Sequence, residues 1–198
     1  NINYRLETFG TRNGLISPKI YSLAQTTDRQ LWIGSELGVS VFDGYTFQNH
    51  QYSSGNETIG RILSITQDST GGVWVGGDKG LFFFYNDSIS RIEIRNKSPL
   101  AIESLLTDAA GNLWIGELNA LYKIPREQIE HVKDNISRPL SAEPYCGLKE
   151  RAYGLAMDRL HNVYMASHGG IYLFPGAQSD YRLIWKNPNV NNFVRSVS

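Results

Sequence analysis

Several features that would point to common protein classes are scarce or missing in this chain. Of its 198 residues only one is a cysteine, Cys146, so no disulfide can form within it. Lysine and arginine total 19, as do aspartate and glutamate, so the net charge is zero. A neutral chain without basic clusters argues against nucleic acid as a partner, because phosphates are neutralised by clustered lysine and arginine.

Long apolar runs are also missing. No stretch approaches the roughly 18 apolar residues that a membrane span needs, and no signal peptide is recognisable at the start. The first residue is Asn1 and not methionine. We therefore expect a processed or trimmed piece of a larger protein, with no direct membrane span in this segment.

The chain does contain one hairpin pattern that is repeated several times. Residues 73–75 are Val-Trp-Val, residues 76–80 are rich in glycine and aspartate, and residues 81–84 are Leu-Phe-Phe-Phe. Two apolar strands around a short glycine-rich turn predict a β-hairpin. Related stretches occur at residues 31–39, 113–121 and 163–171.

Alignment of these copies on their aromatic residue shows a repeat. The aromatic residues Trp32, Trp74, Trp114 and Tyr164 are spaced by 42, 40 and 50 residues. Other positions agree at fixed offsets: glycine or alanine six residues later, aspartate six residues earlier in all but the first copy, and serine or glycine ten residues earlier. The residues six positions later are Gly38, Gly80, Ala120 and Gly170. Those six positions earlier are Thr26, Asp68, Asp108 and Asp158, and those ten positions earlier are Ser22, Ser64, Ser104 and Gly154. A period of 40 to 50 residues is typical of β-propeller blades.

Each copy divides into four short strand patterns, which we name A to D. The sequence therefore predicts an all-β fold, a β-propeller of four-stranded antiparallel blades, here an incomplete arc of about four blades. The best helix candidate, residues 126–132, lies in a longer connection in the third copy. The expected divisions are a leading strand and linker at 1–18, blades at 19–57, 58–98, 99–148 and 149–190, and the first strand of a fifth blade at 191–198.

The two ends of the chain are expected to belong to other blades. Residues 4–9 alternate like a strand, and in closed propellers an N-terminal strand often completes the last blade, which removes exposed edges. Residues 193–198 match residues 61–66 position for position. Four blades with an extra strand at each end do not close an ordinary ring, so we expect the native polypeptide to continue.

The repeated aromatic residue and aspartate have structural interpretations. A large ring on strand B is expected to pack between neighbouring blades, where it buries much apolar area. The aspartate is expected to cap the A–B turn. Its spacing, Asp-x-x-Gly-x-x-Trp, differs from the Asp-x-Gly-x-x-Trp of the sialidase Asp box, so a sialidase is not indicated.

The motifs together resemble the two-component regulator propeller repeat. They are Asn13-Gly14-Leu15-Ile16-Ser17, then Gln67-Asp68 with Gly71 and Trp74-Val75-Gly76, and Asp108 with Gly111-Asn112-Leu113-Trp114-Ile115-Gly116. The resemblance implies a propeller in the sensor region of a hybrid two-component histidine kinase or a related bacterial signalling protein. It also implies a periplasmic or extracytoplasmic location and, in the parent chain, a β-sandwich domain, a membrane helix and a kinase or diguanylate cyclase.

Positions that vary between matching copies are candidates for recognition, because packing does not dictate them. In a propeller the B–C turns and the starts of the A strands lie on one face, around the channel. Charged groups and tyrosines there suit a small polar ligand such as a glycan or peptide. The predicted ligand-binding residues are Lys19, Tyr21, Glu36, Arg61, Asp78, Lys79, Glu103, Glu117, Arg151, Tyr153 and His168. A homodimer is also left open.

The sequence indicates no cofactor, no metal site and no catalytic set. His168 has no second histidine or cysteine at ligand spacing, and the four histidines are not expected to converge. Two alternatives to a sensor module stay open. One is a propeller lyase or glycosidase that uses His168 with a nearby glutamate, and the other is a protein-interaction scaffold.

Overall fold

The computed structural model describes residues 6–54, 57–95, 101–145, 148–177 and 180–188, which contain four four-stranded antiparallel sheets. We name them blades 1 to 4 in chain order. Blade 1 consists of β1 (Ile20–Gln25), β2 (Leu31–Ser35), β3 (Val39–Phe42) and β4 (Phe47–His50). Blade 2 consists of β7 (Ile62–Gln67), β8 (Val73–Gly77), β9 (Gly80–Tyr85) and β10 (Ser88–Ile92).

Blades 3 and 4 repeat this order, with one insertion. Blade 3 consists of β11 (Ser104–Thr107), β12 (Leu113–Gly116), β13 (Leu121–Ile124) and β14 (Glu143–Pro144), and helix α1 (Arg126–Asp134) lies between its last two strands. Blade 4 consists of β15 (Gly154–Met157), β16 (Val163–Ala166), β17 (Gly170–Phe174) and β18 (Arg182–Lys186). Short elements complete the list: η1 (Thr11–Asn13), the β5 (Ser53–Ser54) and β6 (Glu57–Thr58) hairpin, and η2 (Pro175–Ala177).

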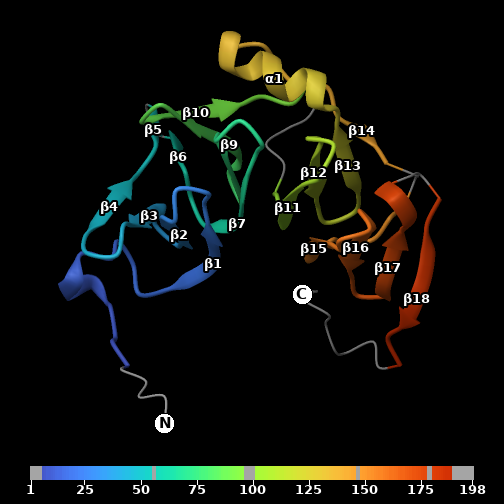
Figure 1. The fold of residues 1–198 in the computed structure, drawn as a ribbon, viewed down its shortest axis with the longest axis horizontal. Coiled ribbons are helices and arrows are strands. Elements are labelled where there is room, and N and C mark those ends of the chain that lie inside the picture. Colours follow the sequence, from blue (N-terminus) through green and yellow to red (C-terminus); the bar gives the residue numbers. More distant parts are fainter. Residues whose placement is uncertain (1–5, 55–56, 96–100, 146–147, 178–179, 189–198) are drawn as a thin grey trace.

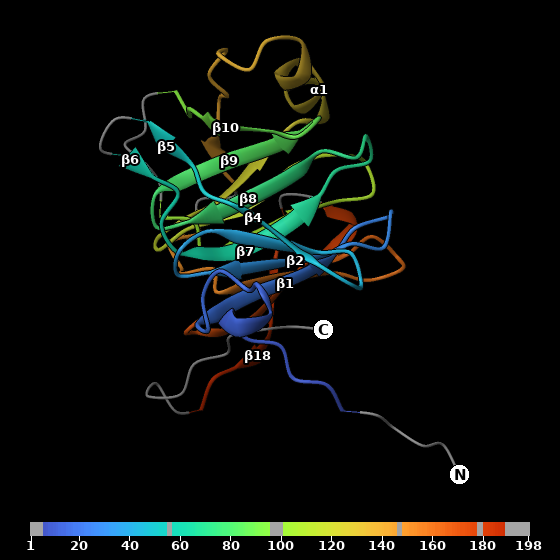
Figure 2. The ribbon, with the colours of Figure 1, turned by 90° about the vertical axis from the view of Figure 1, so that its left-hand side faces the viewer.

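The blades follow one another around an arc (Figure 1). The first strands of the blades, β1, β7, β11 and β15, lie side by side on its inside, and the last strands lie outside. In the side view, the strands of blades 1 and 2 are stacked one above the other, and α1 lies above them at the outer edge of the arc (Figure 2). The predicted all-β fold and incomplete arc of four-stranded blades are confirmed. No helix of the described ranges is long and apolar enough to cross a membrane.

Apolar residues form three clusters, one at each junction between blades. The first joins blades 1 and 2 and contains Trp32, the second joins blades 2 and 3 and contains Trp74, and the third joins blades 3 and 4 and contains Trp114. Trp74 and Trp114 are fully buried. Each tryptophan therefore packs against the following blade, as predicted. The fourth aromatic residue, Tyr164, belongs to the last blade of the arc and is only half-buried.

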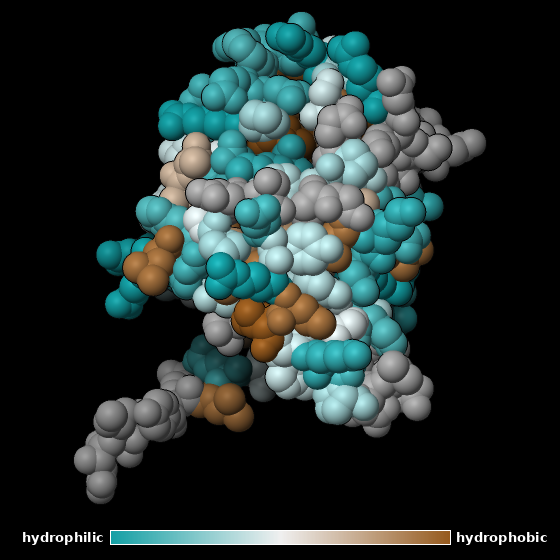
Figure 3. All heavy atoms as spheres, turned by 90° about the vertical axis from the view of Figure 1, so that its right-hand side faces the viewer, coloured by the Kyte–Doolittle hydropathy of each residue, from teal (hydrophilic) through white to brown (hydrophobic). Residues whose placement is uncertain are grey.

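The two end blades expose apolar side chains that the inner blades bury. On β18 of blade 4, Leu183, Ile184 and Trp185 are all exposed, and on β1 of blade 1 Leu23 is 64% exposed. Figure 3 shows brown, apolar side chains among the polar ones on the side of the molecule that carries blade 4. This surface matches the one that inner blades cover with their neighbours.

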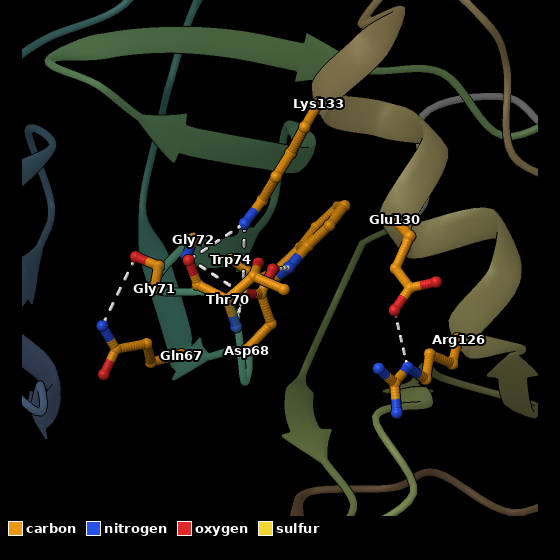
Figure 4. Close-up of polar contacts among 9 residues, drawn as sticks. All are labelled: Gln67, Asp68, Thr70, Gly71, Gly72, Trp74, Arg126, Glu130 and Lys133. Carbon is orange, nitrogen blue, oxygen red and sulfur yellow. Dashed lines mark hydrogen bonds and ion pairs between the residues drawn. The ribbon is translucent and has the colours of Figure 1, made fainter.

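The repeated aspartate connects the A–B turn to the buried ring. Asp68 accepts hydrogen bonds from the backbone N–H of Thr70 (2.8 Å) and of Gly72 (3.0 Å), and its other oxygen accepts from Trp74 Nε1 (3.0 Å; Figure 4). Asp108 binds Trp114 Nε1 in the same way (2.8 Å). The predicted turn cap is present, and the link to the ring is a second role that the sequence interpretation missed.

The repeated serine joins neighbouring blades near the inside of the arc. Ser22 donates from Oγ to the carbonyl of Ile62 (3.3 Å), and Ser104 donates to the carbonyl of Ala152 (2.7 Å). Ser64 is the acceptor for the N–H of Leu105 (2.8 Å). This hydrogen bond between blades explains why the serine recurs in the repeat. The backbone groups that it binds point toward the adjacent blade and not within their own sheet.

Helix α1 confirms the predicted helix and fastens blade 3 to blade 2. Its buried residues Ile129 and Val132 belong to the cluster between these two blades. On the same helix, Lys133 donates to the carbonyl of Thr70 (3.2 Å) and lies 3.7 Å from Asp68, over the ring of Tyr85 (Figure 4). The insertion is thus packed against the arc and is not a free loop.

The expected end strands are only partly within the described residues. Residues 6–9, the described part of the expected leading strand, belong to none of the four sheets, although Phe9 packs against Phe42 and Phe47. The expected fifth-blade strand at 191–198 lies outside the described residues, as does Cys146.

A half-buried histidine gives the junction of blades 1 and 2 a pH dependence. The ring of His50 stacks on Trp32 and meets Phe84 edge-on, and burial lowers its pKa, with a smaller opposite effect from Asp87. The unfolded chain therefore binds the proton more readily. This histidine favours folding above its ordinary pKa of about 6.5, and that contribution is lost as pH falls through this range.

We expect His50→Phe to lose less stability than the wild type between about pH 7.5 and about pH 5.5. Urea unfolding at the two pH values measures the difference. His161→Asn, a change at an exposed turn histidine, is the matched control and is expected to keep the wild-type pH dependence. An unchanged pH dependence in His50→Phe would contradict the assignment.

Candidate functional site

The predicted recognition face is formed where each A strand begins beside a B–C turn. Backbone hydrogen bonds hold the two together: Glu36 N–H donates to Lys19 O (3.2 Å) and Asp78 N–H to Arg61 O (3.2 Å). Between blades, Ala152 N–H donates to Glu117 O (3.1 Å). We call this face the rim. It consists of the A-strand starts and B–C turns of all four blades, and it lies at one end of the inner strands.

On blades 1 and 2, the predicted rim residues pair with each other. Lys19 Nζ lies 3.0 Å from a carboxylate oxygen of Glu36, and this contact raises the pKa of Lys19. Asp78 accepts from Arg61 twice, from Nε (3.1 Å) and from the backbone N–H (2.9 Å). The pair raises the pKa of Arg61, to which Tyr21 adds a smaller effect. These four charges are therefore internally compensated.

Blades 3 and 4 are joined on the rim by a further ion pair. Arg151 Nη2 lies 2.5 Å from Glu103 Oε1, and the guanidinium also lies 4.9 Å from the centre of the Tyr153 ring. Only 15% of the Glu103 side chain is exposed, against 38% for Arg151. Arg151 Nε is buried and has no hydrogen-bond partner among the described residues. Among the described rim residues, Arg151 is the one cation whose unsatisfied donor is buried.

The remaining predicted residues do not join these pairs. Lys79 is exposed next to Asp78, and Glu117 is half-buried; the side chains of both lack a hydrogen bond or ion pair with any described residue. His168 contributes its carbonyl, which accepts from Asn187 Nδ2 (3.2 Å). The rim thus brings together six charged residues in three pairs, with two tyrosines beside them.

Sequence reasoning missed Glu150 as a rim residue. Its carboxylate accepts from Ser167 Oγ (3.2 Å) and from Tyr172 OH (3.4 Å), and burial together with this carboxylate raises the pKa of Tyr172. A signal for it existed. Glu150 precedes Ser167 by 17 residues, the same separation as between Lys19 and Glu36.

The exposure of the pairs determines what the rim can do. Lys19 and Arg61 are 65% and 50% exposed in their side chains, so water screens both ion pairs and they add little to stability. A ligand that offers hydroxyl, carboxylate or peptide groups can therefore replace the internal partner at little cost. The rim is suited to binding a polar molecule by hydrogen bonds.

The four histidines lie on different parts of the arc. His50 ends β4, His131 is on α1, His161 is in the A–B turn of blade 4, and His168 is on the rim. Within the described ranges no group of three or more histidine, cysteine or acidic residues is placed to hold a metal ion.

Solved structures of other proteins share this architecture. The arc superposes on the extracellular domain of BT4673 from B. thetaiotaomicron, assigned to a hybrid two-component system, with a TM-score of 0.65 and 18% identity, over 91% of this chain and 23% of that one. The extracellular domain of BT3049 from the same organism, also assigned to a hybrid two-component system, superposes with a TM-score of 0.67 and 14% identity, over 90% of this chain and 26% of that one. The chain belongs to a β-propeller fold. It spans about a quarter of the length of these domains.

The propeller fold is also shared with an enzyme. A catalytically inactive virginiamycin B lyase from Staphylococcus aureus with quinupristin superposes with a TM-score of 0.71 and 13% identity, over 92% of this chain and 60% of that one. No protein-family profile and no curated protein matches the chain. The likenesses establish a propeller like that of two-component extracellular domains, as the sequence motifs predicted, while function depends on the site.

Proposed function

We propose that this chain is a ligand-binding part of a sensor propeller, located outside the cytoplasm in a bacterial two-component signalling protein. The observation that carries the proposal is the rim. Six of its charged residues lie in three exposed or half-exposed pairs beside Tyr21 and Tyr153, around the inner strands of the arc. The likeness to extracellular domains of two-component systems supports the sensor role.

The ligand class follows from the chemistry of the rim. Paired opposite charges leave little net field, so a strongly charged ligand gains no general attraction, whereas a ligand with many hydroxyl or amide groups can bond to both signs. Tyrosine faces offer stacking surface for a sugar ring or an apolar side chain. A neutral oligosaccharide or a peptide fits this combination.

Arg151 is the residue on which the proposal depends most. Its Nε–H is buried without a partner among the described residues, which costs free energy unless a further acceptor is supplied. In this proposal a ligand oxygen bonds the guanidinium and displaces or bridges Glu103. Ligand binding would then change the contact between blades 3 and 4. This change is the route by which binding would be transmitted to a downstream kinase.

Thermal-shift screening of the parent propeller against oligosaccharides and peptides tests binding. A ligand at 100 times its Kd stabilises by about 2.7 kcal/mol, which corresponds to a Tm rise of roughly 5–10 °C. Arg151→Ala is expected to weaken binding at least about tenfold, since a hydrogen bond to a charged group contributes about 1.5–3 kcal/mol. Arg61→Ala should weaken it less.

The control is Arg126→Ala, which removes an arginine about as exposed as Arg61 that pairs with Glu130 on α1, away from the rim. It is expected to keep full binding. If no ligand raises the Tm, or if rim variants bind as the wild type does, ligand sensing by this face is wrong. Turnover of a polysaccharide or cyclic peptide, abolished by His168→Ala, would instead indicate an enzyme, and co-purification of a macromolecule would indicate a scaffold.

A further inference from the structure

A polar pocket lies away from the rim, on the outer edge of the arc beside α1. It has a volume of about 160 Å³ and is lined by Arg95, Gln128, His131, Val132, Arg138, Pro139, Leu140 and Ser141. These residues come from three segments: the end of the blade 2 sheet, helix α1, and the connection from α1 to β14. The pocket is therefore absent from the other blades, which lack the insertion.

The three segments are held in place by hydrogen bonds. Arg95 N–H donates to the carbonyl of Leu140 (2.8 Å), and the Leu140 N–H donates to the carbonyl of Glu93 (2.8 Å). Gln128 makes two bonds to the backbone of Ser141, donating from Nε2 (3.2 Å) and accepting at Oε1 (2.8 Å). Val132 and Leu140, both buried, form the base. The walls are thus fixed without using the basic side chains.

The basic side chains of the pocket are uncompensated. The side chains of Arg95, Arg138 and His131 make no hydrogen bond or ion pair with any described residue, and no aspartate or glutamate is among the lining residues. This contrasts with the rim, where each arginine has an acidic partner. In a chain of zero net charge, two guanidinium groups at one small pocket, with no partner among the described residues, are a local concentration of positive charge.

We propose that this pocket binds a small molecule through an anionic group, a carboxylate or a phosphate. Two guanidinium groups match the planar oxygen pairs of such anions and can bond them in a bidentate manner. A volume of about 160 Å³ is below the ~300–1,000 Å³ typical of sites for drug-sized ligands, so it admits a single charged group with a small body. The site is independent of the rim and of the function proposed for it.

NMR titration of the purified protein at constant ionic strength tests the site, with three probes: inorganic phosphate, glucuronate and glucose. We expect phosphate or glucuronate to shift the amide signals of residues 95, 128–132 and 138–141 in a saturable manner, and glucose to leave them unchanged. The stronger of the two anions identifies the natural group as phosphate or carboxylate.

Arg95→Gln and Arg138→Gln are each expected to weaken anion binding about tenfold, and the double variant to abolish it. Both side chains are exposed, so the Tm should be unchanged. Arg126→Gln, on helix α1 but outside the pocket, is the matched control and should bind as the wild type does. Absence of saturable shifts up to about 50 mM anion, or equal binding by the double variant, would overturn the proposal, whatever ligand the rim binds.

Discussion

Replacement of Trp74 by alanine is expected to destabilise the protein by about 3–5 kcal/mol, a large part of the total stability of a typical domain. The indole is fully buried at the junction of blades 2 and 3, and its ring centre lies 4.4 Å from that of Phe83. The substitution leaves a cavity there and also removes the Nε1–H that Asp68 accepts, so a buried carboxylate oxygen loses its partner.

Trp74→Phe separates the two effects. It keeps an aromatic ring at the junction, of smaller volume than the indole, and deletes the hydrogen bond to Asp68, so we expect an intermediate loss of about 1.5–3 kcal/mol. The matched variant is Trp32→Phe, because the first blade has Thr26 where the others have aspartate, and it should cost less. Tyr45→Ala, at a side chain that is 91% exposed, serves as the neutral control.

Urea unfolding followed by fluorescence and circular dichroism measures these differences. A Trp74→Phe protein as stable as the wild type would show that the bond from the ring to Asp68 contributes nothing. Equal losses in Trp74→Phe and Trp32→Phe would show that the aspartate is only a turn cap.

Replacement of Gly76 by valine is expected to cost about 2–3 kcal/mol, although valine is a far better strand residue than glycine. A Cβ atom at this position would lie 2.5 Å from Ile102 Cγ2 and 3.1 Å from Leu105 Cδ1, both of the following blade. At Gly76 the glycine is therefore required by the close approach of the next blade and not by the backbone of its own strand. At the equivalent Gly34 and Gly116 an added Cβ would meet both the next blade and a serine of the same blade, Ser22 or Ser104.

A second substitution tests this explanation. Gly76→Val combined with Ile102→Ala should lose at least about 1 kcal/mol less than the sum of the two single changes, because the alanine makes room for the new side chain. Gly71→Ala is the control for backbone effects. Its Cβ would have no neighbour within 4 Å, but φ is +88°, so we expect a loss of about 1–2 kcal/mol that Ile102→Ala does not relieve. Strict additivity for Gly76→Val would contradict the steric account.

Much of the fold was predictable because strand pairing within a blade is local. The strands of one hairpin are separated by a few residues, and their pattern of apolar residues, glycine and aspartate is written directly in the chain. Residues 126–132 were recognised as helical because helix formation likewise depends on residues that are close together in the chain. The leading residues 6–9 alternate like a strand, yet they join none of the four sheets.

The rim was predictable as a place but not as a set of interactions. Position in the repeat identified Lys19, Arg61 and Arg151 as rim residues, while nothing local indicated that Arg151 would pair with Glu103, 48 residues away on another blade. Glu150 was missed because it stands one residue before the compared position of Arg151, and its partners Ser167 and Tyr172 lie 17 and 22 residues further along the chain. The basic pocket at α1 was not indicated at all, since its residues come from three separate segments.

The sequence by itself determined the repeat, the four-stranded blades and the burial of the three repeated tryptophans, because periodic patterns report contacts within about 40 residues. Only the tertiary structure decided which repeated residues join neighbouring blades, as with Ser104 and Gly76, and which charges are paired or left free. The physical reason is that these contacts depend on how two sheets approach each other, and a pattern within one sheet does not record that distance.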